Sequence, residues 1–406
     1  SEYKTGAGAA RAALPARRAE VDFREAEEIF ARLLVTERLD EFARPRPPEV
    51  VEFARALEAA LALTYAEGAE RDDSITGAAN VERAEAAHLF LQRVLYRVNR
   101  LKLFWYDDLY NYENERSEYL RGVRERVESA WQRWESAQLD AEAIKGEDVR
   151  EALVQRAAED VAPAPSACGL YFRDEVGEAG YRRLLAVASL DGLVEASQLS
   201  RTLGGVSNEI HAVMTKLLVE EYGGGRTARK HSTFFTSMLT ELGMSAEPEA
   251  YFRLVPWEVL AAINHSFLLS ERKRFYLRYV GGLLYTEVSV PAAFENYRAA
   301  AERLGMSEKA RGYWELHIRE DERHGRWMLE DVALPLAAKY PSDAWEIVFG
   351  YDQQKLLSGR AGLAVERAAR EAERAAARVE EAGKDEAAAP LNGRGTSGVR
   401  VLGASA

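Results

Sequence analysis

The chain has 406 residues, 47% of them hydrophobic, and a formal net charge of −12. This length can bury one large core or two smaller ones, while the acidic balance argues against nucleic acid or an anionic membrane surface as a partner. Cys168 is the single cysteine, which excludes an internal disulfide and a cysteine-based zinc site. No apolar run is long enough for a membrane span, and the first 20 residues lack the apolar segment of a signal peptide, so we expect a cytoplasmic protein.

Helical patterns fill almost the whole chain. Ala, Leu, Glu and Arg dominate, and apolar residues recur at spacings of three and four, which predicts an all-α fold. The helices expected first along the chain span 16–43, 49–68, 80–104, 115–141 and 147–160. Those expected next span 178–203, 206–222, 227–242, 248–269, 271–289, 292–304, 307–339 and 343–358.

Proline residues and changes of composition divide the chain. Pro163 and Pro165 mark a boundary, which predicts an N-terminal helical region over residues 1–160 and a second domain over 166–360. From 361 to 406 the chain is rich in Ala, Glu and Arg with few large apolar side chains, so we expect an exposed helix followed by a flexible tail.

The most informative motif lies in the last long helical segment, where His317, Asp321 and His324 form an H-x-x-x-D-x-x-H run. At 100° per residue, offsets of four and seven bring these side chains onto one stripe of a helix. Large apolar neighbours such as Trp314 indicate that part of this helix is buried, and a divalent metal suits two imidazoles and a carboxylate that leave water together. The alternative is a solvated helix face, because residues 319–323 are all charged.

A glycine-rich bend upstream carries two more ligand-type residues. Glu221 closes a predicted helix, three glycines follow at 223–225, and His231 comes ten residues after the glutamate. Consecutive glycines end a helix and allow a tight turn, which would place the carboxylate and the imidazole on opposite sides of one bend. An ordinary connecting loop is the alternative.

Two further acidic residues lie in largely apolar stretches. Glu195 follows Leu193-Val194, and Glu287 follows the run that begins with Gly281-Gly282. Each could equally be a helix-edge glutamate at the surface. Taken together, three histidines and four carboxylates are the ligand inventory for two first-row metal ions held between helices: His231, His317, His324, Glu195, Glu221, Glu287 and Asp321.

At these residues the sequence resembles the haem-oxygenase-like diiron oxidases, over roughly two fifths of the chain. The matching runs are Glu221-Tyr-Gly-Gly-Gly, Lys230-His231-Ser232-Thr233-Phe234-Phe235, Arg278-Tyr-Val-Gly-Gly-Leu-Leu-Tyr-Thr-Glu287 and His317-Ile-Arg-Glu-Asp321-Glu-Arg-His324-Gly325. The resemblance implies a helical bundle with an N-terminal helical extension. It also implies that the seven residues above bind two Fe(II) ions, with O2 as co-substrate.

The resemblance carries expectations about activity and partners as well. It implies an oxygenase or oxidase acting on a small amine or amino acid in natural-product biosynthesis, with N-oxygenation favoured. The same site would also serve desaturation or oxidative C–C cleavage of an amino acid or a fatty acid, and a haem-binding or purely structural helical protein is the alternative of another class. An external electron donor and a homodimer, with residues 1–160 as the dimerisation region, are the expected partners; nucleic acid and membrane are not.

Overall fold

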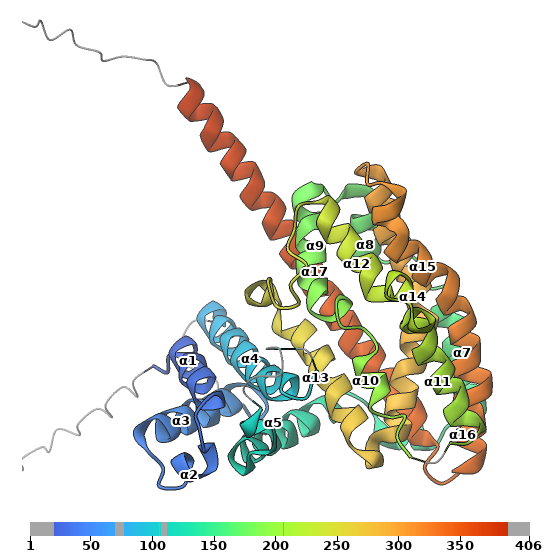
Figure 1. Ribbon diagram of the computed structural model, residues 1–406, viewed down its shortest axis with the longest axis horizontal. Coiled ribbons are helices and arrows are strands. Elements are labelled where there is room, and N and C mark those ends of the chain that lie inside the picture. Colours follow the sequence, from blue (N-terminus) through green and yellow to red (C-terminus); the bar gives the residue numbers. More distant parts are fainter. Residues whose placement is uncertain (1–19, 70–76, 105, 107–111, 206, 389–406) are drawn as a thin grey trace, which may run out of the picture. The chain divides into compact units, whose positions relative to one another are not determined.

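The computed structural model describes residues 20–69, 77–104, 106, 112–205 and 207–388 (Figure 1). The chain divides into two compact units, Ser1–Trp134 and Glu135–Ala406. Within the described ranges every regular element is a helix, so the all-α fold expected from the sequence is confirmed. None of the described helices is both long and apolar enough to cross a membrane.

The first unit is built from amphipathic helices around an aromatic centre. Its elements are α1 (Phe23–Leu34), α2 (Leu39–Ala43), α3 (Pro48–Thr64), α4 (Gly77–Arg100), a 3-10 turn (Glu113–Arg116) and most of α5 (Glu118–Ser136). Phe53 stacks on Phe30 at 4.7 Å and meets Phe90 edge-on at 6.0 Å. The buried Glu27 carboxylate accepts hydrogen bonds from Arg93 and Arg97 of α4, which keeps a charge paired inside this core.

The second unit carries the ligand-type residues. Its longer helices are α7 (Val149–Val161), α9 (Glu178–Gly192), α11 (Glu209–Glu221), α12 (His231–Glu241), α13 (Trp257–Glu271), α14 (Tyr276–Arg303), α15 (Glu308–Arg326) and α17 (Trp345–Ala388). Its short ones are α6 (Ala141–Lys145), α8 (Ala167–Leu170), α10 (Ser197–Ser200) and α16 (Leu334–Lys339). A π-helical segment, Trp327–Ala333, joins α15 to α16.

Helix α14 is the central element of this unit, because it packs against both α15 and α17. Glycines allow the close approach: a Cβ on Gly281 would collide with the carbonyl oxygen of Ile347, and one on Gly350 with that of Arg278. Arg278 also donates to Glu346 and lies over the Phe349 ring, 4.5 Å from its centroid. These contacts fix α14, and with it Glu287, against the rest of the bundle.

The structure differs from several of the expected helix boundaries; the helix expected over 16–43, for example, is broken at 35–38 into α1 and α2. The helix expected over 178–203 is interrupted at 193–196. The two helices expected over 271–289 and 292–304 are one helix, α14, which continues through Pro291. A proline inside a helix removes one backbone donor but is tolerated where packing holds the helix, as it does here. The segment beyond 358 likewise continues α17 without a break to Ala388.

The boundary between the two compact units falls between residues 134 and 135, whereas the sequence predicted a boundary between 160 and 166. Helix α7 therefore packs within the second unit, where Arg156 forms a two-bonded ion pair with Asp352 of α17. Compactness is not a test of independent folding, so the expected division into 1–160, 166–360 and 361–406 stays a prediction. The predicted tail from 389 onward lies outside the described residues.

Candidate metal centre

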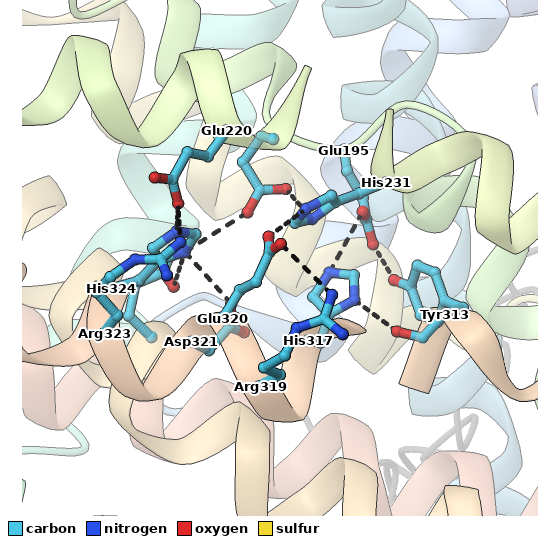
Figure 2. Close-up of polar contacts among 12 residues, drawn as sticks. Glu195, Glu220, His231, Tyr313, His317, Arg319, Glu320, Asp321, Arg323 and His324 are labelled. Carbon is cyan, nitrogen blue, oxygen red and sulfur yellow. Dashed lines mark hydrogen bonds and ion pairs between the residues drawn. The ribbon is translucent and has the colours of Figure 1, made fainter. Parts of the chain in front are cut away.

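The predicted stripe on α15 is buried. His317, Asp321 and His324 are 6%, 3% and 0% exposed, while the charged residues between them include the exposed Glu322. One helix therefore presents two imidazoles and a carboxylate to the interior (Figure 2), while Arg319 and Glu322 of the same helix are exposed. The alternative of a fully solvated stripe is excluded by this burial.

Glu195 reaches the stripe from the interruption between α9 and α10. Ala196, the residue that caps α10, has φ = +65°, a left-handed conformation that costs an alanine about 1–2 kcal/mol. The Glu195 carboxylate accepts a hydrogen bond from the Tyr313 hydroxyl and lies 3.6 Å from His317 Nε2. Helix α9 ends at Gly192, a weak helix former, and the contacts of Glu195 with α15 hold the turn that follows.

The glycine bend holds Glu221 and His231 together, as the spacing suggested. Glu221 is the last residue of α11 and His231 the first of α12. Gly223 has φ = +64°, and a Cβ there would lie 2.5 Å from the Arg229 carbonyl carbon, so only glycine fits. The result is a contact of 2.8 Å between His231 Nδ1 and Glu221 Oε2.

All seven predicted residues converge in two overlapping groups. In the first, ligand atoms of Glu195, Glu221, His231 and His317 lie within 4.8 Å of one another. In the second, the same holds for Glu221, Glu287 and His324. Asp321 joins the second group, because its Oδ1 lies 3.3 Å from His324 Nδ1. Glu221 belongs to both groups, so its carboxylate would be shared if each group held an ion.

Protons balance the buried charges of the site. Burial raises the pKa of Glu195 and that of Glu287 to about 7. Burial alone would lower the pKa of His231, but the adjacent carboxylates of Glu221 and Glu320 outweigh burial and raise this pKa to about 9. Carboxylate neighbours likewise overcome desolvation and raise the pKa of His317 to about 10 and that of His324 to about 11. The protonated imidazoles thus neutralise the buried carboxylates, a role that bound metal ions could take instead.

The donor set fits metal ions. Glu195 Oε2, His231 Nδ1, Asp321 Oδ1 and His324 Nδ1 are buried and have no hydrogen-bond partner among the described residues. Buried polar atoms without a partner are costly, and here they face one another instead of being scattered. Mixed imidazole nitrogen and carboxylate oxygen donors suit iron and similar first-row ions.

Two carboxylates that sequence reasoning did not single out complete the cluster, Glu220 and Glu320. Together with His324 they form a third group whose ligand atoms lie within 4.8 Å of one another. A signal for Glu320 was present, because it lies three residues after His317 and four before His324 and so shares their helix face. Glu220 precedes Glu221 and had no distinguishing pattern.

Comparison with known proteins points to iron chemistry. Residues 182–355 match the profile of a family described as iron-containing redox enzymes. The chain is also 28% identical, over 181 residues, to a nitrosourea synthase of Streptomyces achromogenes subsp. streptozoticus. That match covers 44% of this chain and 38% of the relative, so this chain spans well under half of the relative's length.

Proposed function

Because residues 182–355 belong to the haem-oxygenase-like family of iron-containing redox enzymes, we propose that this oxidoreductase holds two Fe(II) ions and uses O2 to oxidise a small amine or amino acid. The observation that carries the proposal is the pair of ligand groups that share Glu221. A single bridging carboxylate between two N/O ligand sets is the arrangement expected of a two-metal site.

The ligands divide between the two ions by their positions. Glu195, His231 and His317 would hold the first ion, and Glu287, Asp321 and His324 the second, with Glu221 common to both. When bound, two ferrous ions supply electrons for the reduction of O2. The protein supplies the ligand atoms and releases the protons that the histidines carry in the metal-free state.

Aromatic side chains form one wall of the site and exclude water from it. The His317 ring lies 4.4 Å from that of Tyr313 and 5.3 Å from that of Phe294, and Trp314 packs on both of these aromatic residues. The Tyr313 hydroxyl donates to Glu195 and so fixes which oxygen of this carboxylate faces His317. An apolar wall of this kind would limit the access of water to ions bound at this site.

We favour N-oxygenation as the reaction, which places the enzyme in natural-product biosynthesis. The proposal rests on the similarity to a nitrosourea synthase, a protein whose name describes a product with an N–N=O group. Desaturation or C–C cleavage would use the same ligands and is the competing outcome in the assay below. A haem is less suited to the site, because a haem iron takes one or two axial side chains and not four convergent carboxylates.

The remaining expectations stay predictions. They are a cytoplasmic homodimer with residues 1–160 as the dimerisation region, and an external electron donor. Sedimentation of the full chain tests the dimer, and dependence of multiple turnovers on an added reductant tests the donor.

The reaction is tested by loading the metal-free protein with Fe(II) under anaerobic conditions and then adding O2 with a panel of amines, amino acids and fatty acids. Mass spectrometry separates gain of one or two oxygen atoms from loss of two hydrogens. We expect oxygen addition at an amine, its absence in His317→Ala, and its retention in His211→Ala, whose ring contacts the Leu203 carbonyl oxygen instead. Oxidation of fatty acids alone would contradict the amine proposal, and iron loading without any O2 consumption would contradict the oxidase.

A further inference from the structure

Two carboxylates lie on the outer side of the centre, each against a ring nitrogen that points away from the ligand groups. His324 Nε2 lies 2.6 Å from Glu220 Oε2, and His231 Nε2 lies 2.9 Å from Glu320 Oε2 (Figure 2). The side chains of Glu220 and Glu320 are 25% and 20% exposed, whereas the two rings are almost fully buried. These carboxylates therefore stand between the histidines and solvent.

The opposite nitrogen of each ring faces the ligand carboxylates. His231 Nδ1 lies 2.8 Å from Glu221, and His324 Nδ1 lies 3.3 Å from Asp321 and 3.4 Å from Glu287. Both of these Nδ1 atoms are buried without a hydrogen-bond partner among the described residues. Each ring is thus held on its outer side by a hydrogen bond and presents its inner nitrogen to the centre.

The third histidine is oriented by the backbone. His317 Nδ1 donates to the Tyr313 carbonyl oxygen at 2.8 Å, one helical turn earlier, and its Nε2 faces Glu195. The bundle therefore uses a different ring nitrogen for His317 than for the other two histidines. Only the other two need a carboxylate to hold them.

We propose that Glu220 and Glu320 are positioning residues for the two metal ions, an inference that rests on the proposed function. Glu320 holds His231 so that Nδ1 meets the first ion, and Glu220 holds His324 so that Nδ1 meets the second, while His317 binds through Nε2. A carboxylate that accepts the outer N–H fixes the tautomer and orientation of the ring and makes its free nitrogen a better donor.

Neighbouring residues support this role. Glu220 precedes the bridging residue Glu221 and Glu320 precedes Asp321, so one turn of helix supplies both a ligand and the group that orients a histidine. Arg323 donates to Glu220 at 2.7 Å and keeps this carboxylate ionised and in place. The pKa of Glu220 and that of Glu320 are lowered, since hydrogen bonds from His324 and His231 outweigh desolvation.

The first test is a stepwise titration of the metal-free full-length protein with Zn(II), in which calorimetry measures the binding of each ion. Glu320→Ala should weaken binding of one ion about ten- to hundredfold and leave the other unchanged, and Glu220→Ala should do the converse. Glu320→Gln should lose less, because an amide oxygen still accepts the N–H. Glu322→Ala, an exposed acidic residue of the same helix, is the matched control and should bind both ions like the wild type.

The second test reads the ring nitrogens directly and does not depend on activity. The chain has six histidines, so selective ¹⁵N labelling of histidine gives a readable long-range ¹H–¹⁵N spectrum of the Zn(II)-loaded protein. We expect the proton on Nε2 of His231 and His324 and on Nδ1 of His317. Glu320→Gln and Glu320→Ala should perturb the His231 signals alone, which also assigns the affected binding step.

Each outcome decides between the two proposals. Wild-type protein that binds fewer than two ions would overturn the diiron function and the positioning role with it. Two ions in the wild type, with Glu220→Ala and Glu320→Ala both matching Glu322→Ala, would overturn the positioning role alone. Metal on Nε2 of His231 would also overturn the positioning role, because Glu320 would then not hold that nitrogen. A third Zn(II) per chain that Glu220→Ala removes would overturn it too, because the carboxylates would then bind a cation and not the rings.

Discussion

Loading the metal-free protein with a divalent ion should release about two protons from the first group, and the affinity should rise with pH. The pKa of His231 is raised to about 9 and that of His317 to about 10, so both rings are protonated at neutral pH. A metal binds only the neutral imidazole, so each ring that becomes a ligand must lose its proton. Glu195, whose pKa is raised to about 7, adds a fraction of a proton.

The magnitude follows from the same values. At pH 7.5 the two imidazole pKa values lie about 1.5 and 2.5 pKa units above the solution pH, so removing both protons costs roughly 5 kcal/mol at about 1.36 kcal/mol per unit. With two protons exchanged for the first ion, its apparent affinity should rise about a hundredfold for each pH unit between 7 and 8.5. The free energy of metal binding offsets this cost.

The assay is calorimetric titration with Zn(II) at two pH values, in pairs of buffers that differ in protonation enthalpy, because the difference in observed heat counts the protons. His317→Gln should release about one proton fewer. His211→Ala, with its ring outside both ligand groups, is the control and should behave like the wild type. A proton count near zero together with a pH-independent affinity would refute the reasoning, since it would mean that the rings are neutral before metal arrives.

Three further predictions follow from the same geometry. Glu221→Ala should weaken the binding of both ions, whereas Glu287→Ala should weaken the binding of one. A titration with Co(II) monitored by absorbance resolves the two binding steps, and equal effects of the two substitutions would show that Glu221 is not a bridge. Gly224 has φ = +62° and open space around it, so Gly224→Ala should lower the free energy of unfolding in urea by about 1 kcal/mol. Gly223→Ala should lower it severalfold more, because the added Cβ would meet the backbone of Arg229. Equal losses would contradict the close approach at Gly223. The metal-free protein should lose thermal stability as pH rises from 6 to 9. Groups such as His231 and Glu287, whose pKa values are raised in the folded state, stabilise the fold only while they are protonated, and Zn(II) should suppress the loss.

The sequence was sufficient where ligands share one helix or one bend. The spacing of His317, Asp321 and His324 places them on one helix face by helix geometry alone. The three consecutive glycines predict the turn that joins Glu221 to His231. For these residues local rules and tertiary structure agree.

Other features depend on contacts between distant segments. Gly192 marks the end of α9, but the sequence could not show that Tyr313 and His317 of α15 contact the Glu195 carboxylate in the turn that follows. Pro291 suggested a helix end, yet packing against α15 and α17 carries α14 through it. Glu220 could not be chosen over other acidic residues, since its role appears only once His324 is placed beside it.

The central claim is that two ions share Glu221, and crystals soaked anaerobically with Fe(II) test it most directly. Anomalous diffraction at the iron edge should show two peaks about 3.5–4 Å apart, one on each side of the Glu221 carboxylate. The first should contact His231 and His317, and the second His324. A single peak, or two peaks with Glu221 outside the coordination sphere of either, would contradict the account.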